Sequence, residues 1–60
     1  MEKVYLIEHW KGGYWSKERQ KFGGILFATR YYSQTEAEMV ILEIDNKGPV
    51  FVKIGWERKK

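Results

Sequence analysis

Residues 32–49, with the sequence YSQTEAEMVILEIDNKGP, decide the fold because they predict a single helix. Ser33 and Glu36 have the spacing of a capping box, in which the serine oxygen accepts a hydrogen bond from a free helix N–H and the glutamate reaches back to the cap. The same spacing recurs at Thr35 and Glu38. We therefore expect the helix to begin after Ser33 or, as the alternative, after Thr35.

Three consecutive residues mark the end of this helix. Lys47 places a cation near the negative end of the helix dipole, Gly48 can adopt the left-handed cap conformation, and Pro49 cannot continue a helix. These signals bound a helix of about 13 residues, roughly 20 Å long.

Apolar residues divide the helix into two faces. Four of them recur at spacings of three and four and predict the face that packs on a sheet: Ala37, Val40, Ile41 and Ile44. Met39 and Leu42 point away from that face. They are either ordinary exposed apolar residues or a seam for a partner or a second copy.

Strand signals flank the helix on both sides. Residues 3–10 (KVYLIEHW) are rich in β-branched and aromatic side chains, and residues 50–57 (VFVKIGWE) alternate over eight positions. Residues 12–13 are glycines that can turn a hairpin, after which residues 14–15 (YW) begin another strand. The first and last strands are expected to run antiparallel, with the first strand between the second and the last.

The segment between the hairpin and the helix is less regular. Residues 16–24 are polar without a clear period and end in two glycines, which predicts an exposed loop. Residues 25–29 (ILFAT) predict a further strand, and the pattern leaves open whether this strand and residues 14–15 are one interrupted strand or two. The expected fold is one α+β domain over residues 1–60: a small antiparallel sheet of three or four strands with one helix on one face, in ββαβ order.

One face of this sheet is expected to lie open. If the helix-facing residues are Val4, Leu6, Val50, Val52 and Ile54, the opposite face presents Tyr5, Ile7, Phe51 and one of the pair Tyr31 and Tyr32. Large apolar groups on an open sheet often mark an interface, and a two-fold dimer is the commonest way to cover one. We therefore expect a homodimer or a docked partner on this face, with a monomer as the alternative.

Composition excludes several functional classes. The 60 residues contain no cysteine and one histidine, His9, so no disulfide, metal site or cofactor is expected, and the protein is not expected to be an enzyme. No apolar run approaches 18 residues, which predicts no membrane span or signal peptide and a cytoplasmic location. The glycine pairs lack the Lys-Ser/Thr of a phosphate loop. Residues 58–60 are expected to form a frayed basic tail.

The candidate binding surface mixes aromatic and basic side chains. Its members are Trp10, Tyr14, Trp15, Lys17, Arg19, Lys21, Arg30 and Tyr31. The same residue types form hot spots in protein interfaces and stacking platforms for single-stranded nucleic acid. A net charge of +3 is low for a nucleic-acid binder, so we expect a protein-binding module, with a nucleic acid as the alternative partner.

Four short segments carry a family resemblance: VYLI at 4–7, GGYW at 12–15, RYYS at 30–33 and EAE at 36–38. With these segments the chain resembles the very small ββαβ proteins of uncharacterised phage genes. The resemblance implies a phage protein that takes part in host takeover, by binding and inhibiting a host protein in the host cytoplasm. It includes no catalytic motif and assigns no site residue, and residues 16–24 are longer than the family pattern implies.

Overall fold

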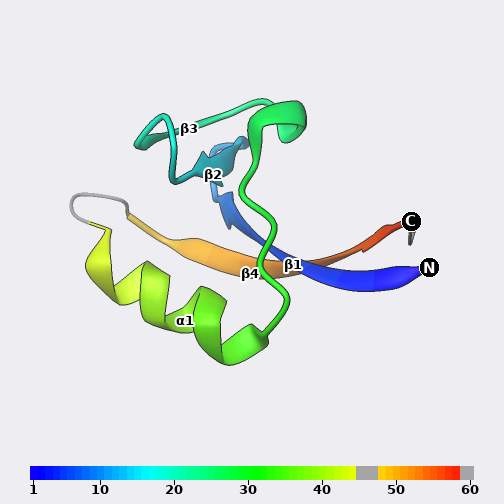
Figure 1. The fold of residues 1–60 in the computed structure, drawn as a ribbon. Coiled ribbons are helices and arrows are strands. Elements are labelled where there is room, and N and C mark those ends of the chain that lie inside the picture. The colour runs from blue at the N-terminus through cyan, green and yellow to red at the C-terminus, as the bar shows by residue number, and fades with distance from the viewer. Residues whose placement is uncertain (45–47, 59–60) are drawn as a thin grey trace.

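A computed structural model describes residues 1–44 and 48–58 (Figure 1). Its elements are β1 (Glu2–His9), β2 (Tyr14–Ser16), β3 (Lys21–Gly23), the 3-10 turn η1 (Ile25–Phe27), α1 (Gln34–Glu43) and β4 (Val50–Glu57). The strands form one antiparallel sheet in the order β3-β2-β1-β4. The α+β class, the single helix and the ββαβ arrangement are confirmed, with β3 as a fourth strand.

β1 is the central strand of the sheet. On one side it pairs with β4 without interruption from Glu2 opposite Glu57 to His9 opposite Val50. On the other side β2 covers only the end of β1, and the main chain of Tyr5 exchanges hydrogen bonds of 2.7 and 3.0 Å with Tyr31. Two separate segments therefore share one edge of β1.

The predicted glycine turn joins β1 to β2. Gly12 and Gly13 have φ angles of 96° and 94°, a backbone region that glycine adopts without a steric cost. The His9 N–H donates to the Gly13 carbonyl at 2.9 Å, and the Lys11 N–H donates to Nδ1 of His9 at 3.1 Å. The single histidine is therefore part of this turn.

The expectation of an exposed loop over residues 16–24 holds for residues 17–20, which form an exposed turn, and was wrong for residue 16 and residues 21–23. Residues 21–23 form β3, which pairs with β2 so that Phe22 lies opposite Trp15. The two rings have centroids 5.2 Å apart. Ser16 is buried, and its Oγ accepts from the Arg19 N–H at 3.2 Å. The lone aromatic in a polar stretch, Phe22, is what holds this segment against the sheet.

The expectation of a strand over residues 25–29 was also wrong. The residues after Gly24 do not extend along the open outer edge of β3, and the Thr29 N–H donates to the Trp15 carbonyl of β2 at 3.0 Å. They close on themselves instead: the Phe27 N–H donates to Gly24 and the Ala28 N–H donates to Ile25, both at 3.1 Å. The question of one strand or two is thereby answered, since only residues 14–15 lie in a strand.

The helix begins where the capping box predicts. Ser33 is the N-cap, and its side chain accepts a hydrogen bond from the Glu36 N–H at 3.4 Å. The helix ends at Glu43 after 10 residues and is capped by Ile44, earlier than expected. Gly48 has a φ of 68° but lies beyond the helix, and Lys47 is outside the described residues. The predicted helix face packs on the core, where Ala37 and Ile44 are buried and Val40 and Ile41 are partly buried.

The two faces of β1 are the reverse of those expected. Ile7 is fully buried and Tyr5 is half-buried in the core beneath α1, whereas Val4 and Leu6 lie in a second cluster with Ala28. The sheet is therefore not open at Tyr5 and Ile7, because α1 covers them, and on the opposite face Ala28, in the chain between η1 and Tyr31, packs against Val4 and Leu6. Both faces of β1 are apolar, and for that reason its pattern alone does not say which one meets the helix.

Replacing Ser33 by Ala should lower the free energy of unfolding by about 1 kcal/mol, because the Glu36 N–H then loses its cap. Urea denaturation followed by circular dichroism measures the difference. Thr35→Ala is the matched control, since Thr35 lies inside α1 and alanine favours a helix. Equal losses for the two variants would contradict the assignment of the cap to Ser33.

Candidate functional site

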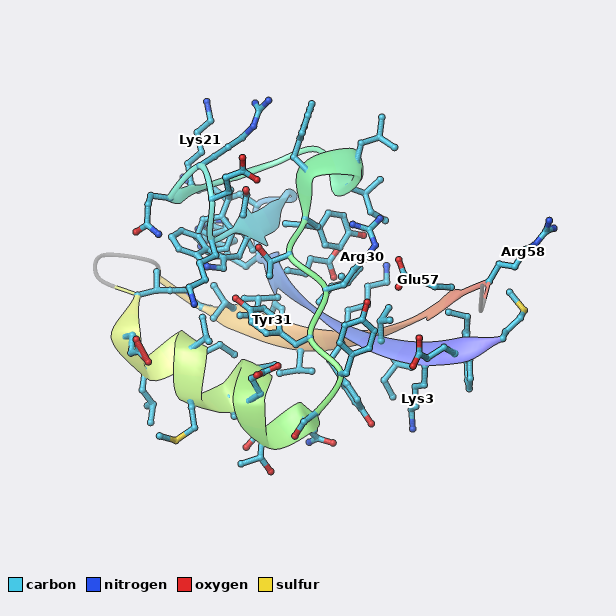
Figure 2. The ribbon with its side chains drawn as sticks, viewed as in Figure 1. Lys3, Lys21, Arg30, Tyr31, Glu57 and Arg58 are labelled. Atoms are coloured by element: carbon cyan, nitrogen blue, oxygen red, sulfur yellow. The ribbon has the colours of Figure 1, made fainter. Side chains whose placement is uncertain are left out.

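Two of the eight candidate residues belong to the core. Trp15 and Tyr31 are both buried, in one cluster with Ile7, Ala37 and Ile44. Tyr31 lies between the sheet and α1 (Figure 2). Neither side chain offers an exposed surface on which a partner could bind.

The polar atoms of these two side chains are also buried. Among the described residues, Nε1 of Trp15 and the hydroxyl of Tyr31 make no hydrogen bond of good geometry. Burial raises the pKa of Tyr31, and the nearby Thr29 and Trp15 partly offset that effect. The tyrosine therefore stays neutral, as a core side chain requires.

Arg30 is held by an acidic neighbour. Its Nε lies 2.5 Å from a carboxylate oxygen of Glu57, and a guanidinium nitrogen donates to the Ala28 carbonyl at 2.8 Å (Figure 2). Tyr32 donates to the same carboxylate at 3.3 Å, and the charge of Glu57 raises the pKa of Tyr32. Most of the charge of Arg30 is thus compensated within the molecule.

Trp10 and Tyr14 lie near the β1–β2 turn. Trp10 follows the end of β1 and is exposed, with the ammonium of Lys11 5.0 Å from its ring centroid. Tyr14 is half-buried, and its hydroxyl oxygen lies 3.4 Å from Nζ of Lys53. This hydrogen bond, together with the charge of Glu8, raises the pKa of Lys53.

The remaining three candidates surround the turn between β2 and β3. Lys17, Arg19 and Lys21 are all exposed there. The Lys17 N–H donates to Oγ1 of Thr29 at 2.8 Å, which ties this turn to the chain after η1. The guanidinium of Arg19 lies 3.6 Å from the ring centroid of Phe27, close enough for a cation–π contact.

The most exposed apolar cluster was not among the candidates. In η1, Ile25, Leu26 and Phe27 have exposed fractions of 50%, 82% and 53%. Together with Arg19 they form what we call the Leu26 surface, at the end of the molecule away from α1 (Figure 1). One sequence signal could have identified this cluster: residues 25–27 follow two glycines directly and do not alternate with polar residues, as the residues of a half-buried strand would.

A groove of about 410 Å³ lies beside the Leu26 surface. It is lined by Ser16, Glu18, Arg19, Leu26, Phe27, Ala28 and Thr29. Its walls combine apolar carbon with one carboxylate and one guanidinium, which suits a side chain of another protein. A smaller cavity of about 170 Å³, lined in part by Trp15, Lys17 and Glu43, lies between α1 and the β2–β3 turn.

Several kinds of site are missing from residues 1–44 and 48–58. No group of three or more histidine, aspartate or glutamate side chains is placed there to hold a metal ion. No helix in this part of the chain is long and apolar enough to cross a membrane.

Among the residues predicted for association with a partner or a second copy, Phe51, Met39 and Leu42 are exposed.

No protein-family model, curated protein or solved structure matches the chain.

Proposed function

We propose that the protein is a non-enzymatic module that binds another protein through the Leu26 surface. The observation that carries this proposal is the exposure of three consecutive apolar residues in η1. Single exposed apolar residues are ordinary, whereas a contiguous exposed group is typical of an interaction site.

The energetics of the Leu26 surface favour protein recognition. Burying a leucine side chain contributes about 1.5–3 kcal/mol, and Leu26 is almost fully available for such burial. Arg19 is already positioned on Phe27, and arginine and aromatic residues are enriched at interface hot spots.

The surface is also fixed before a partner arrives. The Thr29 N–H donates to the Trp15 carbonyl at 3.0 Å, and Oγ1 of Thr29 accepts from Lys17. These bonds hold the two ends of the groove together, so less conformational entropy is lost on binding.

The charges nearby define the chemistry of the partner. Lys17, Arg19 and Lys21 outnumber Glu18 around the β2–β3 turn. A complementary surface therefore has an apolar pocket flanked by carboxylates. Because the sequence resembles small phage proteins, we propose a host protein as the partner and inhibition or modulation of that protein in the host cytoplasm as the role.

Single-stranded nucleic acid is the alternative partner. Such ligands need exposed aromatic planes beside uncompensated cations. The burial of Trp15 and Tyr31 leaves fewer exposed aromatic planes, and the pairing of Arg30 with Glu57 leaves fewer uncompensated cations. Leu26 has no aromatic ring on which a base could stack. These placements favour a protein partner.

The proposal is tested with a matched pair of leucine variants. Leu26→Asp changes a residue of the proposed surface, and Leu42→Asp changes a leucine of similar exposure, 78%, on α1. Tagged wild-type protein and both variants are used to capture partners from a bacterial lysate, and the affinity of a captured protein is then measured by calorimetry.

We expect Leu26→Asp to weaken binding of the partner by at least tenfold, because it replaces an apolar contact by a buried charge. A tenfold change in the dissociation constant corresponds to about 1.4 kcal/mol, which is less than the contribution of one buried leucine. Leu42→Asp should bind like the wild type. Equal binding by both variants would contradict the proposal. Binding to short DNA or RNA that disappears between low and moderate salt would instead support the nucleic-acid alternative.

A further inference from the structure

β4 is an edge strand, and half of its main-chain groups point away from the sheet. Both the N–H and the carbonyl of Tyr5 bond to Tyr31, so they cannot also bond to β4. The β4 residue opposite Tyr5 is Ile54, whose N–H and carbonyl must therefore point outward. By the same alternation, the main-chain groups of Val52 and Trp56 point outward too.

The side chains of two of these outward residues, Ile54 and Trp56, form an uncovered apolar strip. Ile54 and Trp56 lie on the α1 side of the sheet, yet 50% and 61% of their surfaces are exposed. The reason is length, since a helix of 10 residues spans about 15 Å and a strand of eight about 27 Å. Figure 1 shows α1 beneath the first half of β4 only.

The far end of the sheet is a two-stranded arm. Residues 2–4 pair with residues 55–57, and both β2 and the bridge at Tyr31 meet β1 farther from this end. The two termini lie together at its tip (Figure 1). A two-stranded ribbon is marginally stable in water, and a third strand stabilises it.

The outer edge of β4 has none of the usual protection against pairing with another strand. Its eight consecutive pairs with β1 contain no bulge, and residues 50–57 contain no proline. Its one lysine, Lys53, is directed back over the sheet, 3.4 Å from the Tyr14 hydroxyl and 3.9 Å from Glu8.

We propose that β4 pairs antiparallel with β4 of a second copy of this chain, about a two-fold axis at Gly55. In this register Lys53 of each copy lies opposite Glu57 of the other, and Ile54 lies opposite Trp56. Glu57 is already paired with Arg30 of its own chain, so Lys53 of the second copy adds a cation to an existing ion pair rather than meeting a free carboxylate. The outward main-chain groups of Ile54 and Trp56 then bond to each other, two hydrogen bonds for each pair.

Charge complementarity selects this register among those that a two-fold axis allows. An axis at Lys53 places two ammonium groups directly opposite each other, which is destabilising. An axis at Ile54 places Lys53 opposite Gly55 and leaves both charges without a directly opposite partner. Only the axis at Gly55 pairs the two charges and the two exposed apolar side chains at once.

The dimer adds further strands to the two-stranded arm of each copy and covers its exposed apolar side chains. The two arms become one four-stranded sheet, and Ile54 and Trp56 of both copies meet between the two helices. Each aromatic side chain can bury about 150–250 Å². The contact is nevertheless short, so we expect dissociation in the micromolar range, as for small interfaces.

The experiment uses charge reversal at the two opposed positions. In Lys53→Glu and in Glu57→Lys, each homodimer has like charges opposite each other, so its dissociation constant should rise about tenfold or more. Glu57→Lys also removes the ion pair with Arg30, so Lys53→Glu and the mixture of the two variants carry the test. An equimolar mixture of the two variants pairs opposite charges again and should form a heterodimer with nearly wild-type affinity. Sedimentation velocity over a range of concentrations measures each case.

Two further variants keep this test independent of folding. Trp56→Ser removes an exposed side chain and should also weaken the dimer, whereas Leu42→Asp on α1 should not. Circular dichroism shows whether each variant is folded. A wild-type mass that stays at 7.2 kDa up to millimolar concentration would overturn the dimer. A mixture no tighter than the separate variants would overturn the register.

The dimer and the Leu26 surface are tested separately. Leu26→Asp should leave the sedimentation of the protein unchanged, because η1 is not part of β4. Unchanged partner binding by Leu26→Asp would contradict only the Leu26 surface, whereas a wild-type protein that stays monomeric would contradict only the dimer.

Discussion

Ile7→Asp is expected to leave the protein unfolded at room temperature. Ile7 has no exposed surface and lies in the cluster that joins the sheet to α1. An unpaired carboxylate in such a place costs several kcal/mol, while the total stability of a small domain is roughly 5 kcal/mol. Thermal melting followed by circular dichroism measures the loss of folded structure. We expect the signals of both the helix and the sheet to be lost.

Ile25→Asp is the matched control for this variant. It makes the same chemical change in η1, where half of the isoleucine surface already meets water. Its melting temperature should stay within a few degrees of the wild type. If Ile7→Asp melted at the same temperature as Ile25→Asp, the assignment of Ile7 to the core would be wrong.

Trp15→Ala is expected to lower the free energy of unfolding by about 3–5 kcal/mol. Trp15 is buried, and its ring packs against Phe22, the residue that holds β3 to the sheet. The cavity left by alanine would loosen both the core and this strand. Urea denaturation followed by fluorescence of the remaining tryptophans measures the effect.

Trp15→Phe separates packing from hydrogen bonding at the same position. Since Nε1 of Trp15 makes no hydrogen bond of good geometry in the described part of the chain and interacts only weakly with Tyr31, losing it should cost little. We expect this variant to be clearly more stable than Trp15→Ala. A stable Trp15→Ala that no longer bound the partner would instead make Trp15 an interface residue.

Trp15 and Tyr31 show why the candidate surface was only partly predictable. Aromatic side chains are typical of both cores and interfaces, and the sequence does not distinguish these uses. The basic residues of the β2–β3 turn were predicted as surface groups, and Lys17, Arg19 and Lys21 are exposed. Leu26 was missed because its neighbours in sequence predict a strand.

Local sequence signals account for the elements that depend on interactions between near neighbours in the chain. The Ser33 cap acts on residues of the first helical turn, and Gly12 and Gly13 adopt backbone angles that few other residues tolerate. The strands β1 and β4 follow from runs of β-branched and aromatic residues. Each of these signals lies within a few residues of the structure that it produces.

Packing between distant segments sets which face of β1 meets α1 and which segment pairs with β2. Both faces of β1 are apolar, so the choice depends on packing across the whole sheet. Phe22 gives β3 a ring contact with Trp15, and residues 21–23 rather than residues 25–29 pair with β2. Residues 25–27 form η1 instead, where the N–H groups of Phe27 and Ala28 are satisfied within the turn, so that a strand pattern in the sequence becomes a turn whose side chains Ile25, Leu26 and Phe27 remain at the surface.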